Sequence, residues 1–247
     1  MELLEWDAKT YDSLPLPHTR WGAGVIERLG LRGTERIVDL GCGTGRDTQL
    51  LLDLVPNGHV VAVDGSQQML TQLRARLGEQ TERVEIVRAD LTSPFPPAVR
   101  GEAIMSVATF HWVPDHPRLF QRVANALPAG GRFEAEFGGA GNIAAFQAAL
   151  KRAGGPSSSP WDFATAAETA QALTDAGFVD VEVRTVTDPA VLERGEQLEA
   201  FIATVLLGAV LRDLPPAQGR ALVQATAAEL EEPVIDYVRV QLSATRA

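Results

Sequence analysis

The sequence predicts an α/β protein with a doubly wound, mostly parallel sheet that carries helices on both faces. Two observations predict this fold. Short runs rich in Val, Ile and Phe recur from residue 36 onward, and stretches with helical spacing of apolar residues lie between them. Strands that alternate with helices in this way are typical of βαβ units, in which helices cover both faces of a parallel sheet.

The first half of the chain supplies five strands and the helices between them. The strands are expected at residues 36–40, 59–64, 84–87, 103–108 and 132–137. Helices are expected at 47–54, 66–77 and 116–127, with Ser66 as the N-cap of the second and Pro128 closing the third. Before residue 35 the chain lacks a strong period, and a short helix over 21–29 is expected there.

The second half is less regular and completes the sheet. Helices are expected at 142–153 and 166–176, with a loop at 154–160 between them and an alternating strand at 178–187 after them. Two helical stretches, 197–211 and 217–230, then precede a last strand at 234–242. The sheet therefore has seven expected strands, with a helical insertion before the last one.

The composition is that of an acidic globular protein. The 247 residues carry a formal net charge of −10 and a single cysteine, Cys42, which fits a reducing compartment. A strongly negative chain repels a polyanion, so nucleic-acid partners are not expected. The longest apolar stretch, 200–211, is too short to span a bilayer, and the N-terminus has no apolar signal segment. We therefore expect a cytoplasmic protein with no nucleic-acid and no membrane partner.

A glycine-rich loop after the first expected strand is the strongest local motif. Residues 39–45 read DLGCGTG. Glycines let the chain turn sharply and let a ligand approach the backbone amides. The G-x-G-x-G spacing differs from the dinucleotide motif G-x-G-x-x-G, and the loop lacks the Gly-Lys-Ser/Thr ending of a phosphate-binding loop. Turn glycines without a ligand are the alternative interpretation.

Acidic residues close three successive expected strands. Asp39 lies at the end of the first, Asp64 ends the second, and Asp90 follows the third. The carboxyl ends of parallel strands share one edge of the sheet, where ligands bind at the point of strand-order reversal. An acid in the position of Asp64 can accept hydrogen bonds from a ribose diol. Helix capping or turn formation is the alternative for each acid taken alone.

Together, residues 39–45, Asp64 and Ala89-Asp90 resemble the motifs of class I S-adenosylmethionine-dependent methyltransferases, over most of residues 35–138. The resemblance implies a Rossmann-like sheet, S-adenosylmethionine as the cofactor and S-adenosylhomocysteine as the product. It also implies that the loop passes the methionine part, that Asp64 binds both ribose hydroxyls and that Asp90 contacts the adenine amine. The implied cofactor-binding residues are Asp39, Gly41, Gly43, Gly45, Asp64, Gly65, Met69, Asp90, Leu91 and Ala108.

A narrower resemblance is to the trans-aconitate methyltransferase group. It rests on Trp6-Asp7-Ala8 with Tyr11 near the start, and on Phe110-His111-Trp112 after the fourth strand. That group methylates a carboxylate oxygen of a small polyacid, which implies a small-molecule acceptor of the carboxylic acid class. His111 stands where glutamine is more often expected, a departure that weakens transfer of the substrate but not of the cofactor.

The acceptor determines whether a base is needed. Methyl transfer is an in-line displacement, and an ionised carboxylate needs no proton removed, whereas a hydroxyl, amine or carbon acid does. His111 and His18 are the candidate catalytic residues; packing of a polar loop residue on its neighbour is the alternative for His111. Tyr11, Arg20 and Trp112 are the candidate substrate-binding residues, since a guanidinium binds a carboxylate through two N–H groups. No metal site is expected.

The sequence thus predicts one domain over 1–247, with an N-terminal cap segment at 1–34 and a cofactor-binding core at 35–138. Residues 139–247 complete the sheet and carry a helical lid near 190–232. The predicted function is methyl transfer to a small acceptor, with carboxylate O-methylation favoured, by a monomer or homodimer. The alternatives are an NAD(P)-dependent oxidoreductase, since Asp64 could equally hold an NAD ribose, and a non-catalytic methyltransferase-like binding protein.

Overall fold

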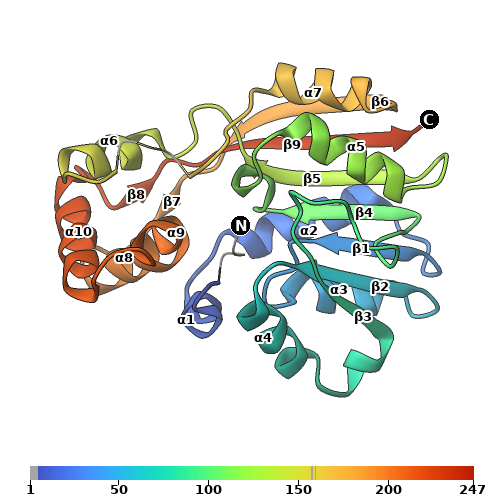
Figure 1. Ribbon diagram of the computed structural model, residues 1–247, viewed down its shortest axis with the longest axis horizontal. Helices are drawn as coiled ribbons and strands as arrows, with labels where there is room; N and C mark the ends of the chain where they lie inside the picture. The colour runs from blue at the N-terminus through green and yellow to red at the C-terminus, as the bar shows by residue number, and fades with distance from the viewer. Residues whose placement is uncertain (1–4, 157, 159) are drawn as a thin grey trace.

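The computed structural model describes residues 5–156, 158 and 160–247, and its centre is a seven-stranded sheet in the order β3-β2-β1-β4-β5-β9-β6 (Figure 1). The strands are β1 (Arg36–Leu40), β2 (His59–Asp64), β3 (Val84–Arg88), β4 (Ala103–Val107), β5 (Arg132–Gly138), β6 (Phe178–Thr187) and β9 (Val238–Arg246). Strands β1 to β5 pair in parallel, and β9 lies antiparallel between β5 and β6. The predicted mostly parallel, Rossmann-like sheet is confirmed, and its strand order reverses between β1 and β4.

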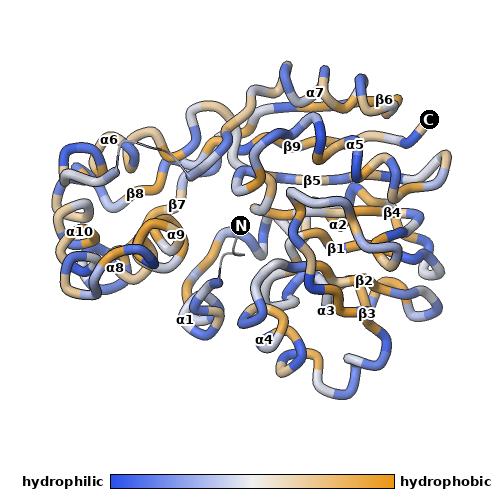
Figure 2. Tube along the Cα trace, in the orientation of Figure 1, coloured by the Kyte–Doolittle hydropathy of each residue, from blue (hydrophilic) through white to orange (hydrophobic). Residues whose placement is uncertain are grey.

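The central strands are buried on both faces because their side chains alternate between two hydrophobic cores. Ile37 packs in the core beneath α2, α3 and α4, whereas Val38 packs in the core beneath α5 and α7. Figure 2 shows hydrophobic residues along β1, β2 and β4. The covering helices are α2 (His18–Leu29), α3 (Arg46–Leu54), α4 (Gln67–Leu77), α5 (His116–Ala126) and α7 (Ala166–Asp175), and the 3-10 helix η1 (Gly78–Arg83) connects α4 to β3.

A short helix near the N-terminus, α1 (Ala8–Ser13), was not expected from the sequence. It is held by its N-cap, because the Asp7 carboxylate accepts a hydrogen bond from the Thr10 N–H at 3.1 Å. A helix of six residues is too short to display a hydrophobic period. Residues 1–4 of the expected cap segment lie outside the described residues.

The helices of the second half lie together beside the sheet, at the left in Figure 1, around a core of their own. They are α6 (Ala144–Arg152), α8 (Glu196–Phe201), the π-helix η3 (Ile202–Leu206), α9 (Gly208–Leu211) and α10 (Pro216–Glu229). The expected continuous helix over 197–211 is wrong. The helix is interrupted at Leu207. The next residue, Gly208, lies so near Trp6 that a Cβ on Gly208 would come within 3.2 Å of the indole. None of the helices in the described ranges is long and apolar enough to cross a membrane.

The last expected strand, 234–242, is two strands separated by a bend. β8 (Val234–Ile235) pairs with β7 (Ala190–Val191) in a small ribbon, and only β9 enters the main sheet. The bend is fixed by Asp236, whose Oδ2 accepts a hydrogen bond from the Ala145 N–H at 2.9 Å. The expected loop at 154–160 contains residues 157 and 159, which lie outside the described residues.

Candidate active site

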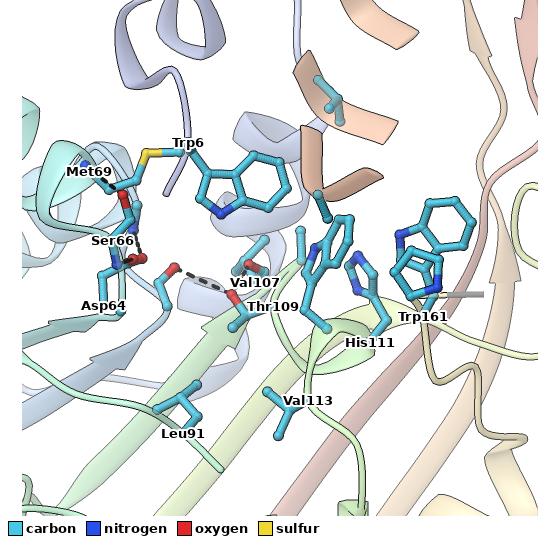
Figure 3. A pocket seen from close by; sticks show the side chains of 18 of the residues that line it. Trp6, Asp64, Ser66, Met69, Leu91, Val107, Thr109, His111, Val113 and Trp161 are labelled. Carbon is cyan, nitrogen blue, oxygen red and sulfur yellow. Dashed lines mark hydrogen bonds between the residues drawn. The ribbon is translucent and has the colours of Figure 1, made fainter. Parts of the chain in front are cut away.

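A cavity of about 370 Å³ lies at the carboxyl edge of the sheet, within the range of small-molecule sites. Its walls come from the segments that follow β1 to β4, from the start of β9, from the N-terminal segment and from the helices around η3. The start of β9 reaches this edge because β9 is antiparallel to β5, and Arg239 pairs with Gly138 at the end of β5. Figure 3 shows the lining side chains from Met69 at one end to Trp161 at the other.

The glycines of the loop after β1 have different environments. Gly43 and Gly45 have φ angles of 53° and 81°, in the left-handed region that favours glycine. A Cβ on Gly43 would meet no atom within 4 Å, whereas a Cβ on Gly45 would lie 2.7 Å from Leu73 Cγ. Gly41 and Gly43 line the cavity and Gly45 does not. Gly45 is therefore required by the packing of α3 against α4, and Gly43 leaves room for a ligand.

Asp64 lines the cavity and also fixes the glycine loop. Its Oδ2 accepts a hydrogen bond from the Gly43 N–H at 2.9 Å, and its Oδ1 accepts one from the Ser66 N–H at 2.8 Å. Burial raises the pKa of this carboxyl. Asp39 lies behind the loop and does not line the cavity: it accepts a hydrogen bond from Thr48 Oγ1 at 2.6 Å, and burial raises its pKa to about 7.

The loop after β3 brings a second carboxylate to the cavity. Asp90 Oδ1 accepts hydrogen bonds from the backbone N–H and the hydroxyl of Thr92, at 2.8 and 2.7 Å. All of the expected cofactor residues except Asp39 and Gly45 line the cavity. This end of the cavity is therefore acidic, and backbone N–H groups hold both carboxylates in place.

The N-terminal segment covers the acidic end. The Glu5 carboxylate accepts a hydrogen bond from Ser66 Oγ at 2.7 Å and pairs with Arg88 at 3.0 Å. Asp12 pairs with Arg46 at 3.1 Å, so the arginine next to the glycine loop is already engaged. These contacts hold the segment against the start of α4.

The opposite end of the cavity holds His111 and Trp112, which lie on the 3-10 helix η2 (Phe110–Trp112). His111 Nδ1 accepts a hydrogen bond from the Gly138 N–H at 3.3 Å, so the proton of the neutral ring is on Nε2. Burial lowers the pKa of His111. The Trp112 ring meets Trp6 edge-on, with the ring centroids 5.1 Å apart.

Tyr11 and His18 form a pair in the same wall. The Tyr11 hydroxyl lies 2.7 Å from His18 Nδ1, within hydrogen-bond distance. Burial lowers the pKa of His18 to about 3 and raises the pKa of Tyr11, so both side chains are neutral near pH 7.

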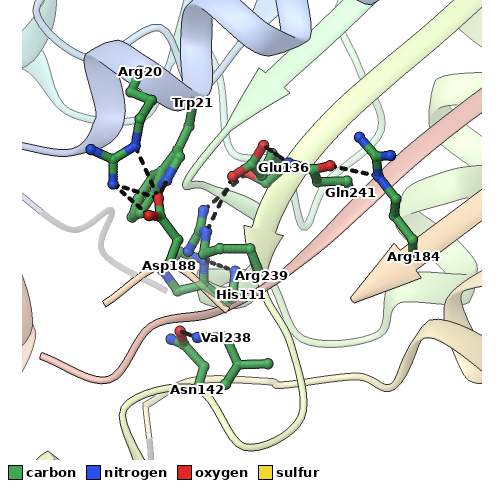
Figure 4. Close-up of polar contacts among 11 residues, drawn as sticks. Arg20, Trp21, His111, Glu136, Asn142, Arg184, Asp188, Val238, Arg239 and Gln241 are labelled. Carbon is green, nitrogen blue, oxygen red and sulfur yellow. Dashed lines mark hydrogen bonds and ion pairs between the residues drawn. The ribbon is translucent and has the colours of Figure 1, made fainter. Parts of the chain in front are cut away.

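Arg20, expected at the acceptor, does not line this cavity. Its side chain is 61% exposed and pairs with Asp188 at 2.6 Å (Figure 4), and both residues line a separate cavity of about 190 Å³. Arg20 lies on α2 beside the segment after β6, which supplies the partly buried carboxylate of Asp188.

Sequence reasoning missed Arg239 and Tyr237, which both line the cavity. Arg239 is 1% exposed; its Cζ lies 3.9 Å from the Trp21 ring centroid, and its Nε lies 3.8 Å from Glu136 Oε1 (Figure 4). Burial lowers the pKa of Arg239 to about 10. The signal in the sequence is a lone arginine within the apolar run 234–242.

Comparison with known proteins gives matches in sequence and matches in structure. The family described as "Methyltransferase domain" matches residues 37–131. Trans-aconitate 2-methyltransferase of Acidovorax sp. (strain JS42) is 35% identical over 127 residues, which are 51% of this chain and 47% of that protein. The match thus spans about half the length of this curated relative, and it covers about half of this chain.

Solved structures share the fold over nearly the whole chain. The YcgJ protein of Bacillus subtilis has a TM-score of 0.66 at 16% identity and covers 93% of this chain and 99% of its own. Phosphoethanolamine N-methyltransferase 2 of Haemonchus contortus, bound to S-adenosylmethionine, has a TM-score of 0.62 at 17% identity, covering 92% of this chain and 52% of its own. The sequence matches and the fold confirm the predicted resemblance to the class I S-adenosylmethionine-dependent methyltransferases.

Proposed function

We propose that this chain, which carries a class I methyltransferase domain, transfers the methyl group of S-adenosylmethionine to a carboxylate oxygen of a small acid. The methyltransferase domain, the named relatives and the structural neighbours support an S-adenosylmethionine-dependent methyltransferase. The observation that carries the proposal is the cavity itself, which has carboxylates from the ends of β2 and β3 at one end and a buried arginine at the other. The trans-aconitate relatives support an acid as acceptor.

The acidic end of the cavity fits the adenosine part of the cofactor. Each oxygen of Asp64 accepts one backbone N–H, and a carboxylate oxygen has a second lone pair for a ribose hydroxyl. Gly43 leaves open the space that a Cβ would fill. Asp90 and Leu91 also line this end, and we propose that they flank the adenine ring.

The state of the two histidines supports an acceptor that needs no base. His111 Nδ1 is occupied by the Gly138 N–H, and His18 Nδ1 is occupied by the Tyr11 hydroxyl. Both rings resist protonation because they are buried. A general base must accept a proton, so we propose that both histidines position neighbouring groups and that the acceptor arrives ionised.

When bound, S-adenosylmethionine supplies a methyl group whose C–S bond breaks as the new C–O bond forms, with the electron pair left on sulfur and no proton moved. The work of the protein is to hold the acceptor in line and to exclude water. The aromatic wall around Trp6 and Trp112 provides that exclusion.

Two measurements test the proposal. Calorimetry with S-adenosylmethionine and S-adenosylhomocysteine is expected to show binding to the wild-type protein, and NADH is expected not to bind. A panel of carboxylic acids with radiolabelled cofactor is expected to yield a base-labile methyl ester. Absence of cofactor binding rejects the proposal, and NADH binding identifies an oxidoreductase. Cofactor binding without transfer to any acid rejects the carboxylate as acceptor and favours a non-catalytic protein.

A further inference from the structure

Charge is divided along the cavity. Among the described lining residues, the carboxylates are Asp64 and Asp90, and the guanidinium groups are Arg212 and Arg239. The carboxylates follow β2 and β3, whereas Arg239 lies on β9 and Arg212 follows α9, so opposite charges occupy opposite ends. The end that faces away from the adenosine position is therefore suited to an anion.

Arg239 is the cation at that end that lies deep in the protein. Nη2 donates to the Glu136 carbonyl oxygen at 3.2 Å, while Nε finds no hydrogen-bond partner among the described residues. The Glu136 carboxylate is 3.8 Å from Nε, beyond hydrogen-bond range, and its Oε2 already accepts from Gln241 at 2.8 Å. A guanidinium has five N–H donors, and buried donors are normally paired, so Arg239 retains capacity for a ligand.

Tyr237 adds a second unpaired donor. Its ring is buried against Trp21, with centroids 5.1 Å apart, and within the described part of the chain its hydroxyl has no hydrogen-bond partner. Tyr237 precedes Arg239 by two residues, and both side chains line the cavity and contact the same indole. The start of β9 therefore presents a hydroxyl and a guanidinium in one wall.

Apart from the neutral polar residues Tyr11, His18, His111 and Asn142, the rest of this end is apolar. Trp161 and Phe163 stack with centroids 5.9 Å apart and an interplanar angle of 6°, and Ile143, Val205 and Leu206 complete the wall. Arg212 is 45% exposed and lies beside Asp213 at 3.5 Å, so it is not a second buried cation. One deep cation within an apolar wall suits a single negative charge on an apolar body.

We infer that the acceptor is a monocarboxylate with an apolar body, and that Arg239 and Tyr237 bind its carboxylate. The inference rests on the proposed function. One carboxylate oxygen is held by the two donors, and the other remains free to form the C–O bond. The acceptor class thus differs from the polyacid named in the relatives.

Ligand binding tests the inference in the presence of saturating S-adenosylhomocysteine. The probes are benzoate, trans-cinnamate and octanoate, the amide of each, and trans-aconitate. At least one monocarboxylate is expected to bind at least about tenfold more tightly than its amide and than trans-aconitate, because the amide lacks the charge that Arg239 recognises.

The variants separate recognition from folding. Tyr237→Phe removes a hydroxyl that no group among the described residues uses, so it is expected to weaken monocarboxylate binding about tenfold without lowering Tm. Arg239→Gln alone leaves the buried Glu136 carboxylate without its cation, so this substitution is combined with Glu136→Gln. The double variant is expected to lose monocarboxylate binding, whereas the Glu136→Gln variant is expected to keep it. Arg184→Gln, on an exposed arginine outside the cavity, is the control and is expected to bind like wild type.

The outcomes distinguish the proposed function from the inference about the acceptor. Failure of S-adenosylhomocysteine to bind wild type overturns the proposed function, and the inference with it. If S-adenosylhomocysteine binds, three results overturn the inference alone. The first is that trans-aconitate binds most tightly, and the second is that no monocarboxylate binds. The third is that Tyr237→Phe and the double variant both keep full affinity for the monocarboxylate.

Discussion

Replacing Gly43 with alanine tests whether the glycine loop faces the cofactor, with Gly45→Ala as the matched control. Both residues have left-handed φ angles, so each alanine costs about 1–2 kcal/mol of folding free energy. The new Cβ at residue 43 meets nothing within 4 Å at a position that lines the cavity, whereas at residue 45 it lies 2.7 Å from Leu73 Cγ. That overlap adds about 1–3 kcal/mol.

The two variants are therefore expected to differ in which property changes more, the cofactor affinity in Gly43→Ala and the Tm in Gly45→Ala. Gly43→Ala is expected to lower Tm by about 2–8 °C and Gly45→Ala by about 4–20 °C, at about 2–4 °C per kcal/mol for a chain of this size. The affinity for S-adenosylhomocysteine is expected to fall at least about tenfold in Gly43→Ala, a loss of about 1.4 kcal/mol, and to stay close to wild type in Gly45→Ala.

Circular dichroism melts and titration calorimetry on the same preparations measure both quantities. Wild-type affinity in Gly43→Ala, or a larger loss of affinity in Gly45→Ala, would refute the assignment of residue 43 to the cofactor wall. Equal Tm values for the two variants would refute the packing argument for Gly45.

Three further predictions concern single carboxylates and one histidine. Asp64→Ala is expected to weaken S-adenosylmethionine binding by about 2–3 kcal/mol in calorimetry, and unchanged affinity would remove Asp64 from the site; the exposed Asp53→Ala is the control. His111→Gln is expected to keep turnover of a carboxylate acceptor within about threefold, whereas a roughly hundredfold fall with intact cofactor binding would mark His111 as a base. Burial and the charge of Asp39 raise the pKa of Asp47 to about 7. The native state therefore keeps a proton that the unfolded chain releases above about pH 4, and the free energy of unfolding falls as the pH rises from about 4 to about 7. Asp47→Asn is therefore expected to raise Tm at pH 8 and to change it little at pH 4.5; equal shifts at both pH values would contradict this.

The acidic end of the cavity, which we propose binds the cofactor, could be located from the sequence because it is built from local units. Each βα unit of a parallel sheet brings its strand end and the following loop to the same edge. Asp64 and Asp90 therefore fall beside the glycine loop as soon as the strands are identified. Asp39 does not line the cavity because, one position before the end of β1, its side chain faces α3 and accepts a hydrogen bond from Thr48.

The acceptor end was not predictable in the same way, because it depends on contacts between distant segments. Arg239 reaches the cavity only because β9 is antiparallel, which a strand pattern does not reveal. Arg20 was the candidate cation, but an exposed guanidinium pairs with whichever carboxylate is near, and Asp188 is 168 residues away along the chain. The helix break at Leu207 likewise lies beside a segment distant in sequence, since Gly208 is close to the Trp6 ring.

The position of β9 also has a consequence for folding kinetics. β6 pairs only with β9 within the described sheet, although β9 is made about fifty residues later in the chain. The cofactor half can form from neighbouring βα units, but β6 must wait for a strand of distant sequence, and such non-local pairing is slow. We expect refolding to show the acceptor end completed last, in the same step that inserts β9.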